Sequence, residues 1–117
     1  MSEVRKRMVA GAAQLLAKRG LTGTSFAEIL DLTGAPRGSV YHHFPDGKDQ
    51  LVGSAVDLAG AQLLDALNRK AGAPAAEITE HFLHIWRSVL TRSNCESGCA
   101  VLAVTIATGS PLSLIHI

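Results

Sequence analysis

The sequence predicts an all-α protein in which a three-helix head precedes a long connecting helix and further helices. Hydrophobic residues make up 47% of the 117 residues, enough to bury the core of one ordinary domain. Aromatic residues make up only 4% while alanine and leucine are abundant, which favours closely packed helices over a β-sandwich. Apolar residues also recur three and four positions apart in successive segments, which glycine or proline separates.

The first two predicted helices form the start of the head. One runs from Ser2 to about Arg19 and ends at Gly20. The second begins near Ser25, which with Glu28 has the spacing of a reciprocal capping box, and it ends at Gly34. The residues predicted to face inward are Val4, Met8, Ala12, Leu15, Leu16, Phe26, Ile29 and Leu30.

The third predicted helix spans Pro36 to about Phe44. Proline is tolerated in a first helical turn because its missing amide hydrogen would have no intrahelical partner there. Val40 and Phe44 lie four residues apart, so both should pack inward. A turn at residues 45–47 follows, with Asp46 placed to cap the next helix.

Three more helices follow the head. The longest should run from about Lys48 to Lys70, and Gly72 ends it. Pro74 opens a fifth helix, and a sixth begins near Gly98. The apolar stripe of the fifth helix consists of Ile78, Phe82, Ile85, Trp86, Val89 and Leu90.

The second and third predicted helices, joined by a glycine-bearing turn, match a helix-turn-helix whose second helix enters the major groove of DNA. The side chains expected to face outward are Arg37, Ser39, His42 and His43. Gly38 lets the backbone come close to DNA, and Tyr41 and Lys48 should flank the surface as phosphate contacts. Arginine can read a guanine edge with two hydrogen bonds.

Several of these residues have an alternative interpretation in which they do not contact DNA. Tyr41 can pack through its apolar ring and still present its hydroxyl, whereas Phe44 is interpreted as a packing residue alone. His42 and His43 can be solvent-facing residues without a role. The charge balance favours an anionic partner only slightly, because residues 1–50 hold seven Lys or Arg against five acids.

The stretch TGAPRGSVYHHFPDGKDQL, residues 33–51, resembles the DNA-binding motif of the TetR family of bacterial transcriptional repressors. The turn FPDGK and the later stretch ESGCAVLAV resemble the LmrA/YxaF-like branch. The resemblance implies a homodimer that grips a pseudo-palindromic operator in double-stranded DNA. It also implies that a small, often lipophilic effector tilts the fourth helix and releases the promoter.

The same resemblance implies a set of site residues and a domain organisation. Residues 1–47 would form the helix-turn-helix domain, and 48–108 the first part of a helical ligand-binding and dimerisation domain. Thr24 and Ser25 would meet phosphate at the start of the second helix. Arg37, Ser39 and His42 would lie nearest the bases, with Pro36 and Gly38 in the same DNA-binding segment, and Tyr41, His43 and Lys48 would hold the backbone. The ligand pocket would include Leu63, Phe82, Trp86 and Val89.

Four residues of metal-ligand type suggest an alternative, a zinc-type sensor built from His81, His84, Cys95 and Cys99. The opposing interpretation makes the histidines surface or pocket residues and the cysteines small buried ones. No metal and no cofactor are predicted.

Other function classes lack support in the sequence. There are no paired carboxylates in a plausible cleft, no GxSxG and no GxxxxGK, so no enzyme is predicted. The N-terminus MSEVRKR is polar, and no stretch of about 18 apolar residues occurs. Two cysteines exclude a disulfide scaffold. These observations predict a cytoplasmic protein without a membrane partner.

The end of the sequence departs from the family, whose members usually run to about twice this length. Residues 109–117 lack helical polarity and caps, and are interpreted as an atypical tail produced by truncation or by foreign sequence joined to a gene fragment. A genuine short apolar tail is the alternative. Truncation would leave dimerisation and ligand response incomplete in this chain, so the second alternative is a non-functional fragment of such a repressor.

Overall fold

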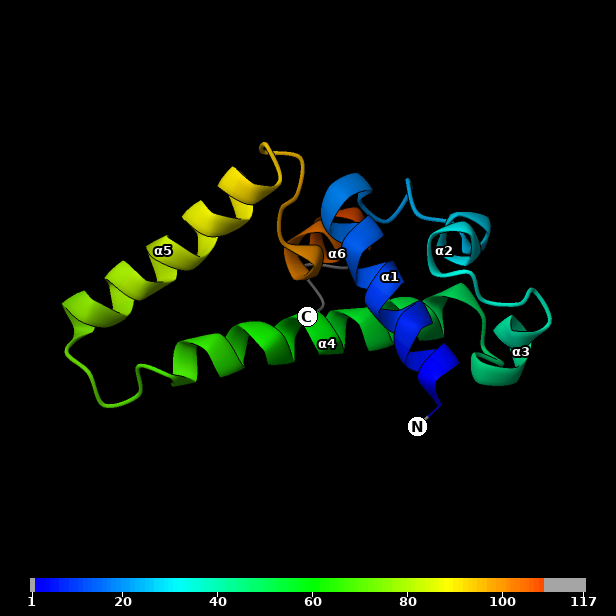
Figure 1. Ribbon diagram of the computed structural model, residues 1–117, viewed down its shortest axis with the longest axis horizontal. Coiled ribbons are helices and arrows are strands. Elements are labelled where there is room, and N and C mark those ends of the chain that lie inside the picture. Colours follow the sequence, from blue (N-terminus) through cyan, green and yellow to red (C-terminus); the bar gives the residue numbers. More distant parts are fainter. Residues whose placement is uncertain (1, 109–117) are drawn as a thin grey trace.

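A computed structural model describes residues 2–108, and this part of the chain is built from helices without strands (Figure 1). The predicted all-α class is therefore confirmed. The helices are α1 (Glu3–Arg19), α2 (Phe26–Thr33), α3 (Ser39–His43), α4 (Lys48–Asn68), α5 (Ala75–Arg92) and α6 (Ala100–Thr108). The tail predicted at 109–117 lies outside the described residues.

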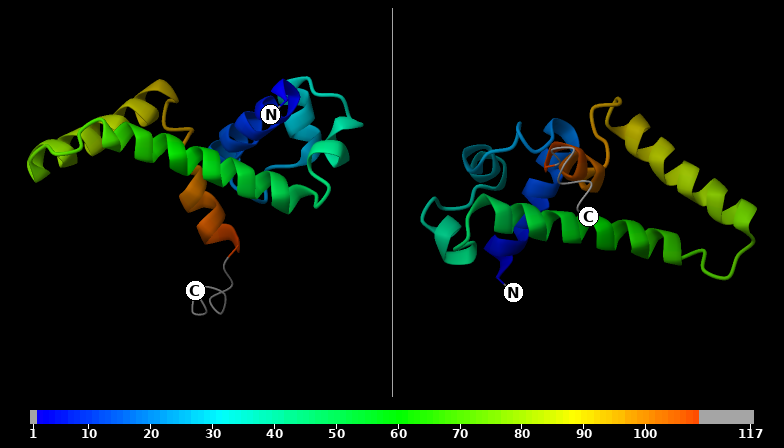
Figure 2. Two further views of the ribbon diagram at one scale, coloured as in Figure 1. Left: turned by 90° about the horizontal axis from the view of Figure 1, so that it is seen from below. Right: turned by 180° about the vertical axis from the view of Figure 1, so that it is seen from behind.

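Helix α4 is the axis of the arrangement. The head formed by α1, α2 and α3 sits at its N-terminal half, and α5 folds back from its C-terminal end (Figure 1). We call α5 and the C-terminal half of α4 the distal arm. Helix α6 packs against α1 and α4, so the chain returns from the distal arm to the head (Figure 2). None of the helices within residues 2–108 has the length and apolar character needed to cross a bilayer.

The core lies where α1, α2, α3 and the first turns of α4 meet. Five large side chains in it are fully or almost fully buried: Met8, Leu16, Ile29, Phe44 and Leu51. Val52 and Ala55 of α4 belong to the same cluster, so the head is closed by the beginning of the connecting helix. Burial of apolar side chains in this cluster is the main source of stability.

A close contact between α1 and α2 depends on a glycine. A Cβ atom on Gly11 would lie 2.5 Å from Cγ2 of Thr33. The Thr33 hydroxyl donates to the Ile29 carbonyl oxygen at 2.7 Å, which restrains the threonine rotamer. The absence of a side chain at Gly11 therefore lets the end of α2 lie against α1.

Helix α3 is shorter than predicted. Pro36 precedes a turn at residues 37–38, and the helix proper starts at Ser39. Pro36 lacks an amide donor and glycine at 38 loses more backbone entropy than other residues, so both weaken a first helical turn. At the other end Phe44 leaves helical dihedrals, with φ −132° and ψ 72°, because a residue that precedes proline avoids the α region.

Two predicted caps differ from the structure. Asp46 does not cap α4: the N-cap is Gly47, with φ 83°, and the Gln50 Oε1 accepts from the Asp46 amide at 3.0 Å. Asp46 lies one position too early to reach the first free amides of the helix. At α2 only half of the reciprocal box forms within the described residues: Ser25 Oγ accepts from the Glu28 amide at 3.3 Å, while the Glu28 carboxylate turns to Arg19.

Helix α5 has the predicted apolar stripe but buries none of its residues within the described part of the chain. Phe82 is 40% exposed and Leu90 is 43% exposed. The His81 Nε2 and the Ala66 carbonyl oxygen, 2.8 Å apart, join α5 to α4. Within the described residues, α4 and α5 thus approach each other closely at few positions.

Candidate nucleic-acid interface and junction cleft

Helices α2 and α3 and the turn between them form a helix-turn-helix. Gly34 ends α2 in the left-handed conformation, with φ 70° and ψ 14°, and its amide donates to the Leu30 carbonyl oxygen at 2.8 Å. Val40 is 4% exposed and Phe44 is fully buried, as the spacing predicted. The opposite side of α3 therefore faces away from the core.

The outward side of this segment is polar, and we call it the α3 face: Arg37, Gly38, Tyr41 and His42. All four residues are exposed. Ser39 was predicted beside them, but its side chain lies outside the described residues. The α3 face offers a guanidinium, a phenol and an imidazole on one short helix and the turn before it, groups that can donate to base edges or phosphate oxygens.

Ring contacts join the α3 face to α2 and to Phe44 of the core. The Tyr41 ring centroid lies 6.4 Å from that of Phe26 on α2, although Tyr41 is 71% exposed. The His42 and His43 centroids are 4.9 Å apart, and those of His43 and Phe44 are 6.5 Å apart. Tyr41 therefore combines a packing contact with an exposed position, the two roles that the sequence left open.

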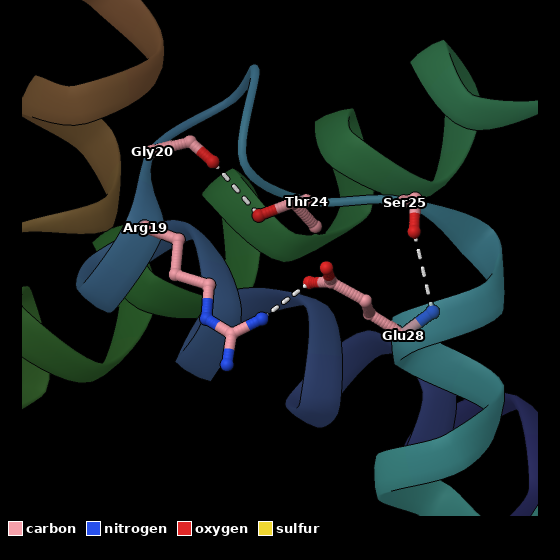
Figure 3. A network of polar contacts seen from close by, with 5 residues as sticks. All are labelled: Arg19, Gly20, Thr24, Ser25 and Glu28. Atoms are coloured by element: carbon pink, nitrogen blue, oxygen red, sulfur yellow. Dashed lines mark hydrogen bonds and ion pairs between the residues drawn. The ribbon is translucent and has the colours of Figure 1, made fainter.

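Thr24 and Ser25, predicted together as phosphate contacts, have different environments (Figure 3). Thr24 is 1% exposed, and its hydroxyl donates to the Gly20 carbonyl oxygen at 2.8 Å. Its amide donates to the Leu21 carbonyl oxygen at 3.3 Å. Both donors of Thr24 are thus used inside the protein, and the phosphate role predicted for it does not fit this geometry.

Ser25 is exposed and caps α2. Its Oγ accepts from the Glu28 amide, which leaves the hydroxyl hydrogen available for an external acceptor. Arg19 Nη1 donates to Glu28 Oε2 at 2.8 Å and joins the end of α1 to the first turn of α2 (Figure 3). Glu28 thus contacts both ends of the loop between α1 and α2: its amide bonds to Ser25 and its carboxylate bonds to Arg19.

Lys48 has a role that the sequence did not reveal. Its Nζ donates to the Leu21 carbonyl oxygen at 3.0 Å, and its side chain is half-buried. The ammonium group thus ties the first turn of α4 to the loop between α1 and α2. Lysine carries three donors, so a phosphate contact would use the remaining ones.

A cleft of about 410 Å³ lies between the head and the distal helices, and we call it the junction cleft. Its walls come from α1, α4, α5 and the segment that enters α6. Its larger or more polar lining residues are Gln14, Gln62, Leu63, Trp86, Val89 and Cys99. No acid or base lines it within the described residues, so it suits an uncharged, largely apolar molecule.

The predicted ligand pocket overlaps this cleft in part. Leu63, Trp86 and Val89 line it, but Phe82 does not and is 40% exposed. Ser97 and Cys99 line it without having been assigned to it. Both residues reach the junction cleft because the neighbouring Gly98 amide donates to the Ala17 carbonyl oxygen at 2.9 Å. This is a bond between main-chain atoms, so the pattern of side chains in the sequence could not predict it.

The four residues of metal-ligand type do not form a site. Among residues 2–108, no group of three or more His, Cys, Asp or Glu side chains lies close enough to hold a metal ion. His81 lies against the Ala66 carbonyl oxygen, Cys95 is exposed, and Cys99 lies in the junction cleft with its Sγ 3.5 Å from the Leu102 amide. The four residues are near one another in the sequence, but the fold does not place them around a common point.

Residues 8–55, which run from within α1 to the first turns of α4, match the family model for bacterial regulatory proteins of the tetR family. The chain belongs to the TetR family. This TetR-family chain is 37% identical over 109 residues to an uncharacterized HTH-type transcriptional regulator of Mycobacterium tuberculosis, covering 93% of the chain and 55% of the relative. The chain thus spans about half the length of that relative.

Other relatives support the narrower resemblance. LmrA, an HTH-type transcriptional regulator of Bacillus subtilis, is 42% identical over 53 residues, 45% of this TetR-family chain and 28% of LmrA. YxaF of the same organism is 38% identical over 56 residues, 48% of the chain and 29% of YxaF. An HTH-type transcriptional repressor of Mycobacterium tuberculosis is 35% identical over 91 residues, 78% of the chain and 46% of the repressor. No solved structure shows significant similarity to the chain.

These names agree with the prediction that the TetR-family chain is not an enzyme, because the relatives named above are regulators of transcription. The helix-turn-helix assigned from the sequence coincides with the residues that the family model matches.

Proposed function

We propose that this protein is a transcriptional repressor that binds a pseudo-palindromic operator through α2 and α3 and releases it when a small molecule occupies the junction cleft. The observation that carries the proposal is the two-sided character of α3. Val40 and Phe44 anchor one side in the core, while Arg37, Tyr41 and His42 are exposed on the other. A short helix presented in this way fits the major groove.

Each predicted DNA contact except Thr24 has a place in this proposal. Arg37 reads a base edge together with Ser39 and His42, and Gly38 and Pro36 let the backbone approach. Ser25, Tyr41, His43 and Lys48 hold phosphates. Thr24 is left out of the contact set, because it is buried and its hydroxyl is bonded to Gly20.

The repressor, effector and dimer parts of the proposal have separate support. One relative of 35% identity is named a repressor. The uncharged junction cleft supports an apolar effector, and its walls include α1 of the head as well as α4. A pseudo-palindrome requires two heads at a fixed spacing, so the proposal includes a homodimer.

The test is selection of bound duplexes from a random pool at moderate salt, performed with the unmodified chain and with Arg37→Ala. We expect the unmodified chain to enrich a pseudo-palindrome and Arg37→Ala to lose preference at one base pair per half-site, since a bidentate arginine contact discriminates by about 1–3 kcal/mol. Uncharged apolar compounds added to the selected complex should release the duplex and change Trp86 fluorescence.

Arg69→Ala is the matched control. Arg69 is exposed near the far end of α4 and pairs with Asp65 at 3.6 Å, so its loss removes one positive charge without touching the α3 face. It should retain the full base preference. An Arg37→Ala preference identical to that of the unmodified chain would remove Arg37 from the base contacts, and no enrichment by the unmodified chain would contradict operator binding by this chain.

A further inference from the structure

The recognition helix proposed above is too short to fix its own orientation. Helix α3 has five residues, and its N-cap Gly38 makes no side-chain capping bond. A single helical turn forms few internal hydrogen bonds, and these do not offset the backbone entropy that is lost when the turn forms. The orientation of the α3 face must therefore come from the side chains that pack on Val40 and Phe44.

Arg5, on the first turn of α1, reaches Phe44 across the head. Its guanidinium carbon lies 5.0 Å from the centroid of the Phe44 ring, within the range of a cation–π contact. Its Nη2 also lies 3.4 Å from Ser54 Oγ on α4. One side chain thus joins α1, the C-terminal end of α3 and α4.

We propose that Arg5 is a positioning residue for DNA recognition: it holds Phe44, and through Phe44 the α3 face, in the orientation that reads DNA. The role does not require Arg5 to touch DNA. The inference rests on the proposed function for its DNA readout, while its effect on α3 can be measured without DNA.

The position of Phe44 explains why a contact on its ring matters. Phe44 is fully buried, closes α3 as its C-cap, and donates its amide to the Val40 carbonyl oxygen at 2.8 Å. Backbone movement at Phe44 therefore changes the last turn of α3 directly. Movement of the ring away from Arg5 would rotate the α3 face relative to α1.

Arg5→Met tests the proposal, because methionine keeps much of the apolar volume over the ring but removes the cation and its donors. We expect the Phe44 amide to exchange with solvent roughly two- to fivefold faster, the size of a cation–π contact at a partly exposed site. Amides of α2 should keep their exchange rates. Arg5→Lys should restore part of the protection.

The DNA readout uses a duplex selected by the unmodified chain. Arg5→Met should weaken binding roughly two- to fivefold while the dependence of log Kd on log salt concentration keeps its slope. Loss of a phosphate contact would instead reduce that slope by about one. Lys6→Met is the matched control, because Lys6 is an exposed cation one residue along α1 that pairs with Glu3 at 3.7 Å.

Three results would overturn the proposal. A slope reduced by about one, with unchanged exchange at Phe44, would make Arg5 a phosphate contact. Equal acceleration of exchange throughout α1, α2 and α3 would make it a general stabiliser of the head. Unchanged exchange and binding would leave it without a role. If the unmodified chain selects no duplex, the proposed function fails while the exchange rates still decide the role of Arg5.

Discussion

At the scale of single residues, the neighbouring hydroxyl groups of Thr24 and Ser25 have different roles, one in the interior and one at a helix cap. Ser25 is exposed at the start of α2, while Thr24 is turned inward toward the Gly20 carbonyl oxygen. The sequence predicted the cap at Ser25 because its spacing to Glu28 is local. The sequence could not distinguish the role of Thr24 from that of Ser25. The acceptor for the Thr24 hydroxyl is the carbonyl oxygen of Gly20, the C-cap of α1, and its position depends on how α1 ends. The inward packing of Val40 and Phe44 was predictable from helical spacing alone.

Replacement of Thr24 separates stability from DNA binding. Thr24→Val removes the hydroxyl that bonds to Gly20, and the free energy of unfolding should fall by about 1 kcal/mol, as for a typical intramolecular hydrogen bond. The affinity for a selected duplex should stay unchanged under conditions in which the chain is folded. Urea unfolding and a titration of labelled duplex provide the two measurements.

Ser25→Ala is the matched comparison for Thr24→Val. It removes an N-cap and should also destabilise the chain by about 1 kcal/mol, but it should in addition weaken duplex binding about two- to tenfold through the lost phosphate contact. Weaker binding by Thr24→Val than by Ser25→Ala would return Thr24 to the contact set.

At the scale of helices, α1 and α5 differ in how they are stabilised. Helix α1 buries six of its residues, including Met8 and Leu16, whereas α5 buries none within the described part of the chain. Both helices were predictable, because periodic apolar residues and terminal glycines or prolines mark them in the sequence. The start of α3 was predicted three residues early, because a proline permits a helix start without requiring one.

Local opening should follow this difference. We expect α5 amides to exchange with solvent much faster than α1 amides, because few buried contacts must break to expose them. Hydrogen exchange followed by mass spectrometry of peptides from residues 75–92 and 3–19 measures the two rates. Comparable protection of the two helices would show that α5 is covered in solution.

At the scale of the whole molecule, apolar side chains remain exposed over the distal arm and α6. They are Leu64, Phe82, Leu83, Leu90, Leu102 and Ile106. Exposed apolar groups on this scale are typical of surfaces that associate. The sequence predicted the helices that carry them but not the return of α6 to α1, because that packing depends on a loop conformation with left-handed Asn94 and Cys95.

The chain should therefore self-associate through α5. Sedimentation velocity should show an average mass that rises with concentration, and Leu83→Glu combined with Leu90→Glu should return it to the monomer mass, because both leucines are nearly half exposed and lie on one side of the helix. Thr79→Glu with Thr91→Glu adds the same charges at exposed polar positions. Equal behaviour of the two double variants would contradict association through the leucines.

The bond from the Gly98 amide to the Ala17 carbonyl oxygen attaches the head to the segment before α6, in addition to the continuous helix α4 and the packing of α6 against α1. Rotation of the head relative to α5 and α6 therefore has to strain this bond and the packing of α6 on α1. Since both atoms belong to the main chain, this restriction tolerates side-chain substitution at either residue and is altered only by changes in loop length or backbone course.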